Sequence, residues 1–249
     1  MGNDAGYIQK IIKKVGRAIN EYGLVGEGDR CLVAMSGGKD SQVLLETFSM
    51  RRKNLPVSYD VYAVHVDVRP VPYEADRAYL ESFCSRLGVD IIFRGVDIDT
   101  AGKNPGDICF LCSWHRRKVL FDMMKELRCN KLVFGHHMDD ILETLFMNMA
   151  YQGSISTMPP RLSMFSGEFD IIRPLTLLTK EEILEYVRIR GFPDQKKECP
   201  YGDNTGRGEA GKFIAEFTSR NKDAKQTIFN AMSNIKPEYL PRKIKQEKD

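Results

Sequence analysis

Met35-Ser36-Gly37-Gly38-Lys39-Asp40-Ser41 is the stretch of sequence that decides the fold. It ends a short apolar run, 31–35, that is typical of a buried strand, and it leads into residues 41–52, whose apolar positions follow helical spacing. Two adjacent glycines let the backbone turn sharply and approach a ligand closely. The first N–H groups of a helix have no partner inside the helix, so they can bind an anion. The stretch therefore predicts a phosphate-binding loop between a strand and a helix.

The charged residues of this loop narrow the choice of ligand. Lys39 adds a positive charge, whereas the carboxylate of Asp40 would repel phosphate unless Mg²⁺ lay between them. Two glycines alone would fit an ordinary turn with a serine cap, but the complete Ser-Gly-Gly-Lys-Asp-Ser run after a strand favours an ATP site. Residues 206–213 approach the Walker A pattern, yet Phe213 stands where that pattern needs a hydroxyl, and no strand is expected before it. We therefore expect one ATP site.

Strand and helix patterns alternate outward from this loop. Further strands are expected at 59–68, 89–94, 131–134 and 169–172, and further helices at 4–22, 73–87, 113–127, 139–150 and 180–190. Such alternation predicts an α/β fold, a twisted parallel sheet with helices on both faces, whose ligands bind beyond the carboxyl ends of the strands. We expect a helical N-terminal extension (1–26), a nucleotide-binding domain (27–195) and a C-terminal loop and helix (196–249). Residues 199–211 are expected to form a loop.

The composition excludes two classes of protein. With 42% hydrophobic and 29% charged residues, the chain is neither disordered nor a membrane protein. It has no apolar stretch of about 18 residues, and residues 1–10 lack the apolar core of a signal peptide, so a cytoplasmic location and no membrane partner are expected. Basic residues cluster at 13–17, 51–53, 116–118 and 242–248. These clusters suit RNA, or the solvated faces of ordinary helices.

A second candidate motif is Gly135-His136-His137-Met138-Asp139-Asp140, which joins the strand at 131–134 to the helix that follows. Its two carboxylates could cap the helix, or they could hold Mg²⁺ beside the phosphates. A hydrolase centre built from histidine and aspartate would need further ligands, and only His65 and His115 remain as histidines. We therefore favour the Mg²⁺ interpretation.

Six cysteines in a chain expected to be cytoplasmic should be reduced. Those that fall inside expected strands or helices, or next to one, are best explained as packing residues: Cys31, Cys84 and Cys129. Cys109-Phe-Leu-Cys112 follows a loop that contains glycine and proline, and Cys199 lies in another loop. From spacing alone the pair could be redox-active, or could join Cys199 as three ligands of a [4Fe–4S] cluster, although such clusters usually take four cysteines.

These segments together resemble the tRNA 2-thiocytidine synthetase family of PP-loop ATP pyrophosphatases. Besides the two motifs above, the resemblance rests on Cys109-x-x-Cys112-x-x-x-Arg116-Arg117 and on the sequences at 141–146, 158–160 and 172–175. It covers residues 7–240. It implies a fold like that of the adenine nucleotide alpha hydrolases.

The resemblance also implies a function, a transferase that thiolates tRNA. ATP would adenylate the C2 carbonyl oxygen of a pyrimidine, foremost an anticodon-loop cytidine, and sulfur would replace that oxygen, with AMP and pyrophosphate as products. The family's ligands for the [4Fe–4S] cluster correspond to Cys109, Cys112 and Cys199. The residues expected at the nucleotide and Mg²⁺ are Ser36, Gly37, Gly38, Lys39, Asp40, Ser41, Val64, His65, Val66 and Gly135, and those with catalytic roles are Asp40, Arg116, Asp139 and Asp140. The expected partners are tRNA, a sulfur donor such as a cysteine desulfurase, and a second copy of the chain in a homodimer.

The sequence departs from the family at the later cluster ligand. The bacterial form carries a second Cys-x-x-Cys there, whereas this chain has only Cys199, and its Cys-Pro-Tyr is more similar to the tRNA 2-thiouridine synthetases. Those enzymes have terminal zinc-finger cysteine pairs that are not found here. Uridine is therefore the alternative target. A tRNA-lysidine-type ligase would need none of the three cysteines, and a non-catalytic RNA- or nucleotide-binding protein would not need the three aspartates.

Overall fold

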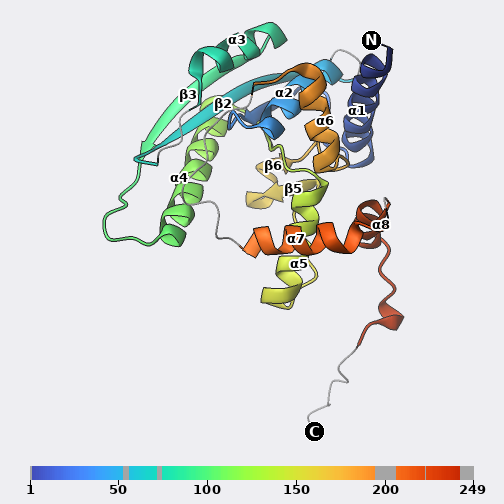
Figure 1. Cartoon of the computed structure of the whole chain (residues 1–249). Coiled ribbons are helices and arrows are strands. Elements are labelled where there is room, and N and C mark those ends of the chain that lie inside the picture. Colours follow the sequence, from blue (N-terminus) through green and yellow to red (C-terminus); the bar gives the residue numbers. More distant parts are fainter. Residues whose placement is uncertain (1, 53–55, 72–74, 194–205, 222, 242–249) are drawn as a thin grey trace.

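A computed structural model describes residues 2–52, 56–71, 75–193, 206–221 and 223–241. Its centre is a six-stranded sheet with the strand order β3-β2-β1-β4-β6-β5 (Figure 1). Every neighbouring pair is parallel except β5 and β6, which are antiparallel. The strands are β1 (Asp29–Ala34), β2 (Tyr59–Arg69), β3 (Asp90–Asp97), β4 (Lys131–Val133), β5 (Arg161–Met164) and β6 (Phe169–Ile172). The predicted α/β fold with a largely parallel sheet is confirmed.

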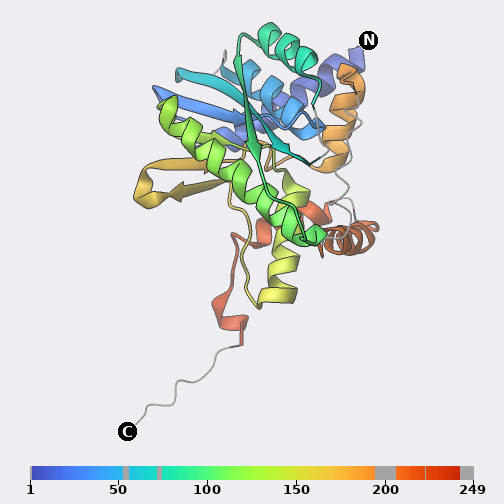
Figure 2. The same cartoon turned by 90° about the vertical axis from the view of Figure 1, so that its left-hand side faces the viewer.

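Helices cover both faces of this sheet. They are α1 (Gly2–Glu21), α2 (Lys39–Arg52), α3 (Arg77–Leu87), α4 (Pro105–Glu126), α5 (Met138–Gln152), α6 (Lys180–Arg190), α7 (Gly206–Thr218) and α8 (Ala224–Ala231), with short 3₁₀ turns η1 (Phe165–Gly167) and η2 (Pro237–Tyr239). Helices α1, α2, α3 and α6 share a hydrophobic core on one face, and α4 packs on the other face, where it crosses the front of the sheet in Figure 2. None of the described helices is both long and apolar enough to cross a membrane.

The central position of β1 creates the place where a ligand can bind. The apolar run of β1 is buried on both sides, as expected for a strand between two layers of helices, and Leu32 and Val33 are fully enclosed. The chain leaves β1 toward β2 on one side and later returns to β4 on the other. At such a reversal the loops after two neighbouring parallel strands diverge and leave a crevice at their carboxyl ends. The two predicted motifs follow these two strands.

The structure corrects several predicted boundaries. Helix α4 begins at Pro105 rather than at residue 113, because the Asn104 side chain accepts the Asp107 N–H at 3.0 Å and proline suits the first helical position. Cys109 and Cys112 therefore lie inside the helix and not before it. Helix α3 begins at Arg77 rather than at residue 73, and α7 begins at Gly206, within the predicted loop 199–211. The antiparallel edge strand β5 was not predicted.

The N-terminal helix is part of the main core. Ile11, Val15 and Ile19 of α1 are almost fully buried in the same cluster as residues of β1, α2 and α6. At its surface, Lys14 Nζ lies 2.6 Å from the Glu182 carboxylate on α6. The segment predicted as an extension, residues 1–26, thus contributes to the packing of the nucleotide-binding fold.

Candidate active site

The loop at 35–38 joins β1 to α2 and is shaped by the first turn of that helix. Gly37 has a φ of +89°, which favours glycine. The Ser41 hydroxyl donates to the Gly38 carbonyl at 2.8 Å and accepts the Gly37 N–H at 3.2 Å. The Gln42 amide donates to the Gly37 carbonyl at 2.9 Å. Side chains of the helix thus hold the loop in shape, as a preformed phosphate site requires.

The second motif contacts this loop through its glycine. A Cβ atom added to Gly135 would lie 3.1 Å from the Asp40 carbonyl oxygen, 3.2 Å from the Asp40 carbonyl carbon and 3.4 Å from the Ser41 nitrogen. Only a residue without a side chain lets the strand end after β4 approach the first turn of α2 this closely. The fold therefore brings the two predicted motifs into backbone contact.

Three predicted carboxylates surround the buried ring of His137. The distances are 4.0 Å from His137 Nε2 to Asp40 Oδ1, 3.5 Å from Nε2 to Asp140 Oδ2, and 3.8 Å from Nδ1 to Asp139 Oδ2. Burial raises the pKa of the Asp40 carboxyl, His137 lowers it and Asp140 raises it, and the net effect is an increase. Sequence reasoning quoted His137 within the motif but gave it no role. Its position two and three residues before a pair of aspartates is the signal that could have identified it.

Both oxygens of Asp139 are already bound by protein donors. Lys225 Nζ on α8 lies 2.6 Å from Asp139 Oδ1, and the Lys180 N–H donates to Oδ2 at 2.8 Å. Lys225 also lies 2.8 Å from a Glu181 oxygen. Burial lowers the pKa of Lys225, but the hydrogen bonds to the two carboxylates outweigh it and raise the pKa. The start of α5 is thus fixed to α6 and α8, a role for Asp139 that the sequence did not predict.

The remaining two carboxylates suit a magnesium ion. Mg²⁺ is commonly held by one or two carboxylates together with substrate phosphates. Asp40 belongs to the phosphate loop and Asp140 to the second motif, and the two segments meet at Gly135. One oxygen of Asp140 accepts the His137 N–H at 3.0 Å. Among the described residues, no group of three or more His, Cys, Asp or Glu side chains has the geometry of a complete metal site. A metal here would therefore need ligands from the nucleotide.

The middle of β2 supports the entry to the phosphate loop. The Met35 N–H donates to the Val64 carbonyl at 2.8 Å, and His65 Nδ1 lies 2.8 Å from the Met35 carbonyl. His65 Nε2 lies 3.0 Å from Asp67 Oδ1. Burial alone would raise the pKa of Asp67, but hydrogen bonds from Arg77 and His65 bring it below its ordinary value. The His65 ring is thus enclosed between the loop and Asp67, which leaves the backbone of β2 for any contact with a base.

The cysteine pair lies in the first half of α4. Cys109 and Cys112 are one helical turn apart, both are partly buried, and Arg116 follows one turn after Cys112 on the same side of the helix. Two thiols at this spacing can bind one metal or cluster together. The third predicted ligand, Cys199, lies outside the described residues.

The other three cysteines are packing residues. Cys31, Cys84 and Cys129 are buried in the hydrophobic cores. Burial raises the pKa of Cys84 to about 12 and that of Cys129 to about 11, and it raises the pKa of Cys31 strongly. Because the thiolate is the form that binds metals, these side chains are poor ligands.

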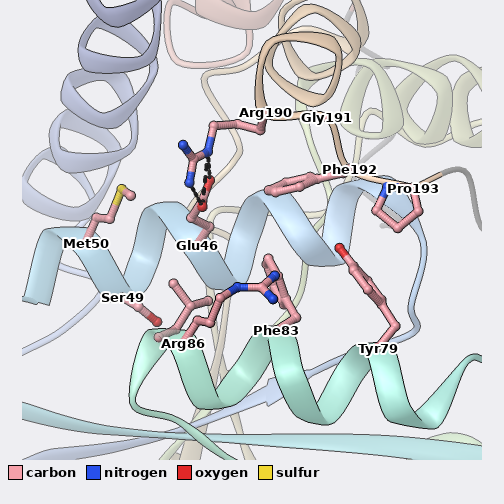
Figure 3. Close-up of a pocket in the computed structure, with 11 residues that line it drawn as sticks. Glu46, Ser49, Met50, Tyr79, Phe83, Arg86, Arg190, Gly191, Phe192 and Pro193 are labelled. Atoms are coloured by element: carbon pink, nitrogen blue, oxygen red, sulfur yellow. Dashed lines mark hydrogen bonds and ion pairs between the residues drawn. The ribbon is translucent and has the colours of Figure 1, made fainter.

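A separate pocket of about 460 Å³ lies between α2, α3 and the end of α6 (Figure 3). Its most buried charge is Glu46, which is paired with Arg190 Nε at 2.9 Å and accepts the Tyr186 hydroxyl at 2.6 Å. The carboxylate is therefore neutralised within the protein. The pocket begins at the second half of α2, whereas the phosphate loop is at its start, so we do not assign it to the active site.

Comparison with known proteins gives consistent matches along the chain. A PP-loop domain family matches residues 8–195. The tRNA-cytidine(32) 2-sulfurtransferase of Geobacter sulfurreducens is 35% identical over 239 residues, which cover 93% of this chain and 92% of that protein. A tRNA-cytidine(32) 2-sulfurtransferase 1 of Francisella tularensis is 34% identical, with 93% and 88% covered.

Solved structures agree on the fold. The U34-tRNA thiolase NcsA from Methanococcus maripaludis, solved with its [4Fe-4S] cluster, matches with a TM-score of 0.73 and 21% identity, over 97% of this chain and 82% of that one. The NH3-dependent NAD synthetase of Campylobacter jejuni matches with a TM-score of 0.50 and 16% identity, over 96% of this chain and 99% of that one. At these identities the likeness concerns the arrangement of strands and helices.

Proposed function

The chain belongs to the PP-loop family of tRNA-cytidine(32) 2-sulfurtransferases, and from this we propose that it is an ATP-dependent enzyme that thiolates a cytidine in the anticodon loop of tRNA. The observation that carries the proposal is the backbone contact between Gly135 and Asp40. It unites the phosphate loop and Asp40 with a second available carboxylate, that of Asp140, at the carboxyl ends of β1 and β4. A nucleotide bound there would meet groups that can bind its phosphates and Mg²⁺.

The first half of the reaction uses the loop and the second motif. The N–H groups at the start of α2 and the Lys39 side chain would bind the phosphates. Asp40 and Asp140 would hold Mg²⁺, and the backbone of Val64 to Val66 would border the adenine. The C2 oxygen of the cytidine attacks the α-phosphorus, the bond to pyrophosphate breaks, and the base carries AMP on oxygen. Adenylation turns that oxygen into part of a good leaving group.

The second half of the reaction replaces this group with sulfur. Cys109 and Cys112, with Cys199, would hold a [4Fe–4S] cluster, which supplies an open iron for the transfer of sulfur when it is bound. The half-buried pair on α4 fits this role, because the buried cysteines are unsuited to ligate metal. Arg116 places a positive charge beside the pair, where it stabilises negative charge that develops as AMP departs. Asp139 acts by fixing the start of α5 rather than by binding the metal.

The remaining parts of the proposal concern the partners and the base. The enzyme takes its sulfur from a donor such as a cysteine desulfurase, works in the cytoplasm and forms a homodimer. The base that it thiolates is cytidine. Uridine is the alternative, because the chain has a single later cysteine, Cys199, in place of a second Cys-x-x-Cys.

The test compares tRNA nucleosides from a deletion strain and from the same strain complemented with wild-type or Asp40→Asn protein. Wild-type protein should restore 2-thiocytidine, and the variant should not, because it loses a Mg²⁺ ligand. Purified, anaerobically reconstituted protein should release AMP and pyrophosphate only with tRNA present. Loss of 2-thiouridine instead would move the target to uridine, and release of ADP and phosphate would refute the adenylation step.

A further inference from the structure

The solvent-facing side of α4 carries two aromatic residues followed by two cations. Phe110 is 68% exposed and Trp114 is 49% exposed, and Arg117 and Lys118 are exposed as well. The spacing of four, seven and eight residues from Phe110 places all of them on one side of the helix. We call these four residues the α4 stripe. Figure 2 shows that α4 lies on the outside of the molecule, in front of the sheet.

This pattern is unusual for a surface helix, whose outer face is normally polar. Lys118 Nζ lies 5.7 Å from the centre of the Trp114 ring, and the His115 ring meets that ring edge-on at 4.8 Å. The indole is therefore held in place by its neighbours while half of its surface stays in contact with solvent. A rigid, exposed ring with cations beside it is the combination that single-stranded RNA requires, since bases stack on aromatic rings and phosphates bind cations.

The stripe lies on the same turns of α4 as the cysteine pair, but on the opposite side of the helix. At 3.6 residues per turn, Phe110 and Trp114 point roughly 150° away from Cys109 and Cys112, and Cys112 packs against the core while both rings are exposed to solvent. We propose that the α4 stripe is the platform on which unpaired anticodon-loop nucleotides of the tRNA stack while the target base reacts. The proposal rests on the proposed function and adds the surface that holds the substrate. A protein partner that binds through apolar contact alone would leave the two cations unexplained.

The basic cluster on α1 is less suited to this role than the sequence suggested. Lys14 is paired with Glu182 at 2.6 Å and its side chain is only 21% exposed, and Arg17 is paired with Glu21 at 3.4 Å. Their charges are therefore partly neutralised within the protein. The predicted basic tail, 242–248, lies outside the described residues. Arg117 and Lys118 belong to another of the predicted basic clusters, and exposed aromatic rings lie beside them.

The chain offers its own probe for this proposal, because Trp114 is its single tryptophan. An unmodified tRNA transcript with a cytidine at position 32 should quench the Trp114 fluorescence of the reconstituted protein and shield it from acrylamide. Phe110→Ala and Trp114→Ala should each weaken tRNA binding roughly fivefold or more, the loss expected for one stacked base. Trp114→Phe should retain most of the affinity, because it keeps an aromatic face. Tyr239→Ala, which removes a ring that is 80% exposed on η2, is the matched control and should bind like wild type.

The outcomes separate this proposal from the proposed function. If wild-type protein thiolates the tRNA while Trp114 stays fully accessible and both alanine variants bind normally, the platform is wrong and the function stands. If tRNA shields Trp114 but no thiolation occurs, the platform stands and the function is wrong. Protein that binds no tRNA refutes both. Alanine variants that lose only their response to a sulfur donor would mark the stripe as a protein-binding surface and overturn the proposal.

Discussion

Replacing Gly135 with alanine tests whether the two motifs work as one site. The new methyl group would lie 3.1 Å from the Asp40 carbonyl oxygen and 3.2 Å from its carbon, which is a few tenths of an ångström closer than a comfortable contact. The φ of Gly135 is not in the positive range, so alanine suits the backbone itself and only the lack of space opposes it. The neighbouring atoms belong to a backbone and cannot rotate away. Either the first turn of α2 or the start of α5 must shift.

We expect this shift to cost about 1–3 kcal/mol in the free energy of unfolding, the usual cost of an added methyl group in a tight site. ATP binding should weaken as well, because Asp40 and Ser41 belong to the phosphate loop. Urea unfolding measures the first effect, and calorimetric titration with a non-hydrolysable ATP analogue measures the second. Thiolation should decrease with the loss of ATP affinity.

The matched control is Gly6→Ala on α1. A Cβ atom at Gly6 would meet nothing within 4 Å, so this change should stabilise the helix slightly, by up to about 1 kcal/mol. If Gly135→Ala were as stable as wild type and bound the ATP analogue equally well, the contact between the motifs would have no energetic importance. The argument for a joint site would then be refuted.

Three further predictions concern ion pairs and thiols. Lys225→Met should cost roughly 1–3 kcal/mol, less than the ~3–5 kcal/mol for breaking a fully buried pair, because this pair is partly exposed and Asp139 keeps the Lys180 N–H. The same change should lower kcat, and Lys225→Arg should restore much of both in urea unfolding and turnover assays. Burial raises the pKa of Asp170, but hydrogen bonds from Lys131 and Ser163 outweigh it and hold it below its ordinary value. The ionised Asp170 carboxylate therefore contributes its full stabilisation above a pH of about 4, near the pKa of aspartate in the unfolded chain. This contribution is lost as the pH falls through the lower pKa that Asp170 has in the folded protein. The free energy of unfolding should fall less between pH 7 and pH 3 in Asp170→Asn than in wild type. An equal fall in both proteins would contradict this assignment. Alanine at any proposed cluster ligand should abolish thiolation and leave ATP binding intact, whereas alanine at a packing cysteine should cost only about 1 kcal/mol of stability. The proposed ligands are Cys109, Cys112 and Cys199, and the packing cysteines are Cys31, Cys84 and Cys129. Analysis of bound iron and sulfide, together with analysis of tRNA nucleosides, distinguishes the two sets.

The sequence predicted the fold well because its strongest signals are local. Apolar runs such as 31–35, followed at once by glycine and a helical pattern, specify a buried parallel strand and its crossover. The start of α4 was placed too late, because the polar and glycine-containing residues before Cys109 look like a loop, although Asn104 and Pro105 carry the capping signal. Strand β5 is only four residues long and depends on pairing with β6, so no local pattern revealed it.

The sequence proposed a list of site residues but could not predict how they are arranged. The family resemblance placed Asp40, Asp139 and Asp140 together as catalytic residues, whereas in the structure Asp139 is bound by Lys225, a partner 86 residues away in sequence. It also places His137 among all three carboxylates. Long-range contacts of this kind depend on how the helices pack around the sheet, which periodicity in a single sequence does not encode.

The attachment of α1 to α6 has a consequence for synthesis on the ribosome. Lys14 and Glu182 are separated by 168 positions in the chain. At about 5–20 residues per second, α1 leaves the ribosome roughly 10–30 s before its partner is made. Throughout that interval α1 can pack against α2 but not against α6. The nascent chain therefore depends on early docking of α1 with α2, and a translational pause before residue 180 would prolong the stage at which it is most prone to aggregate.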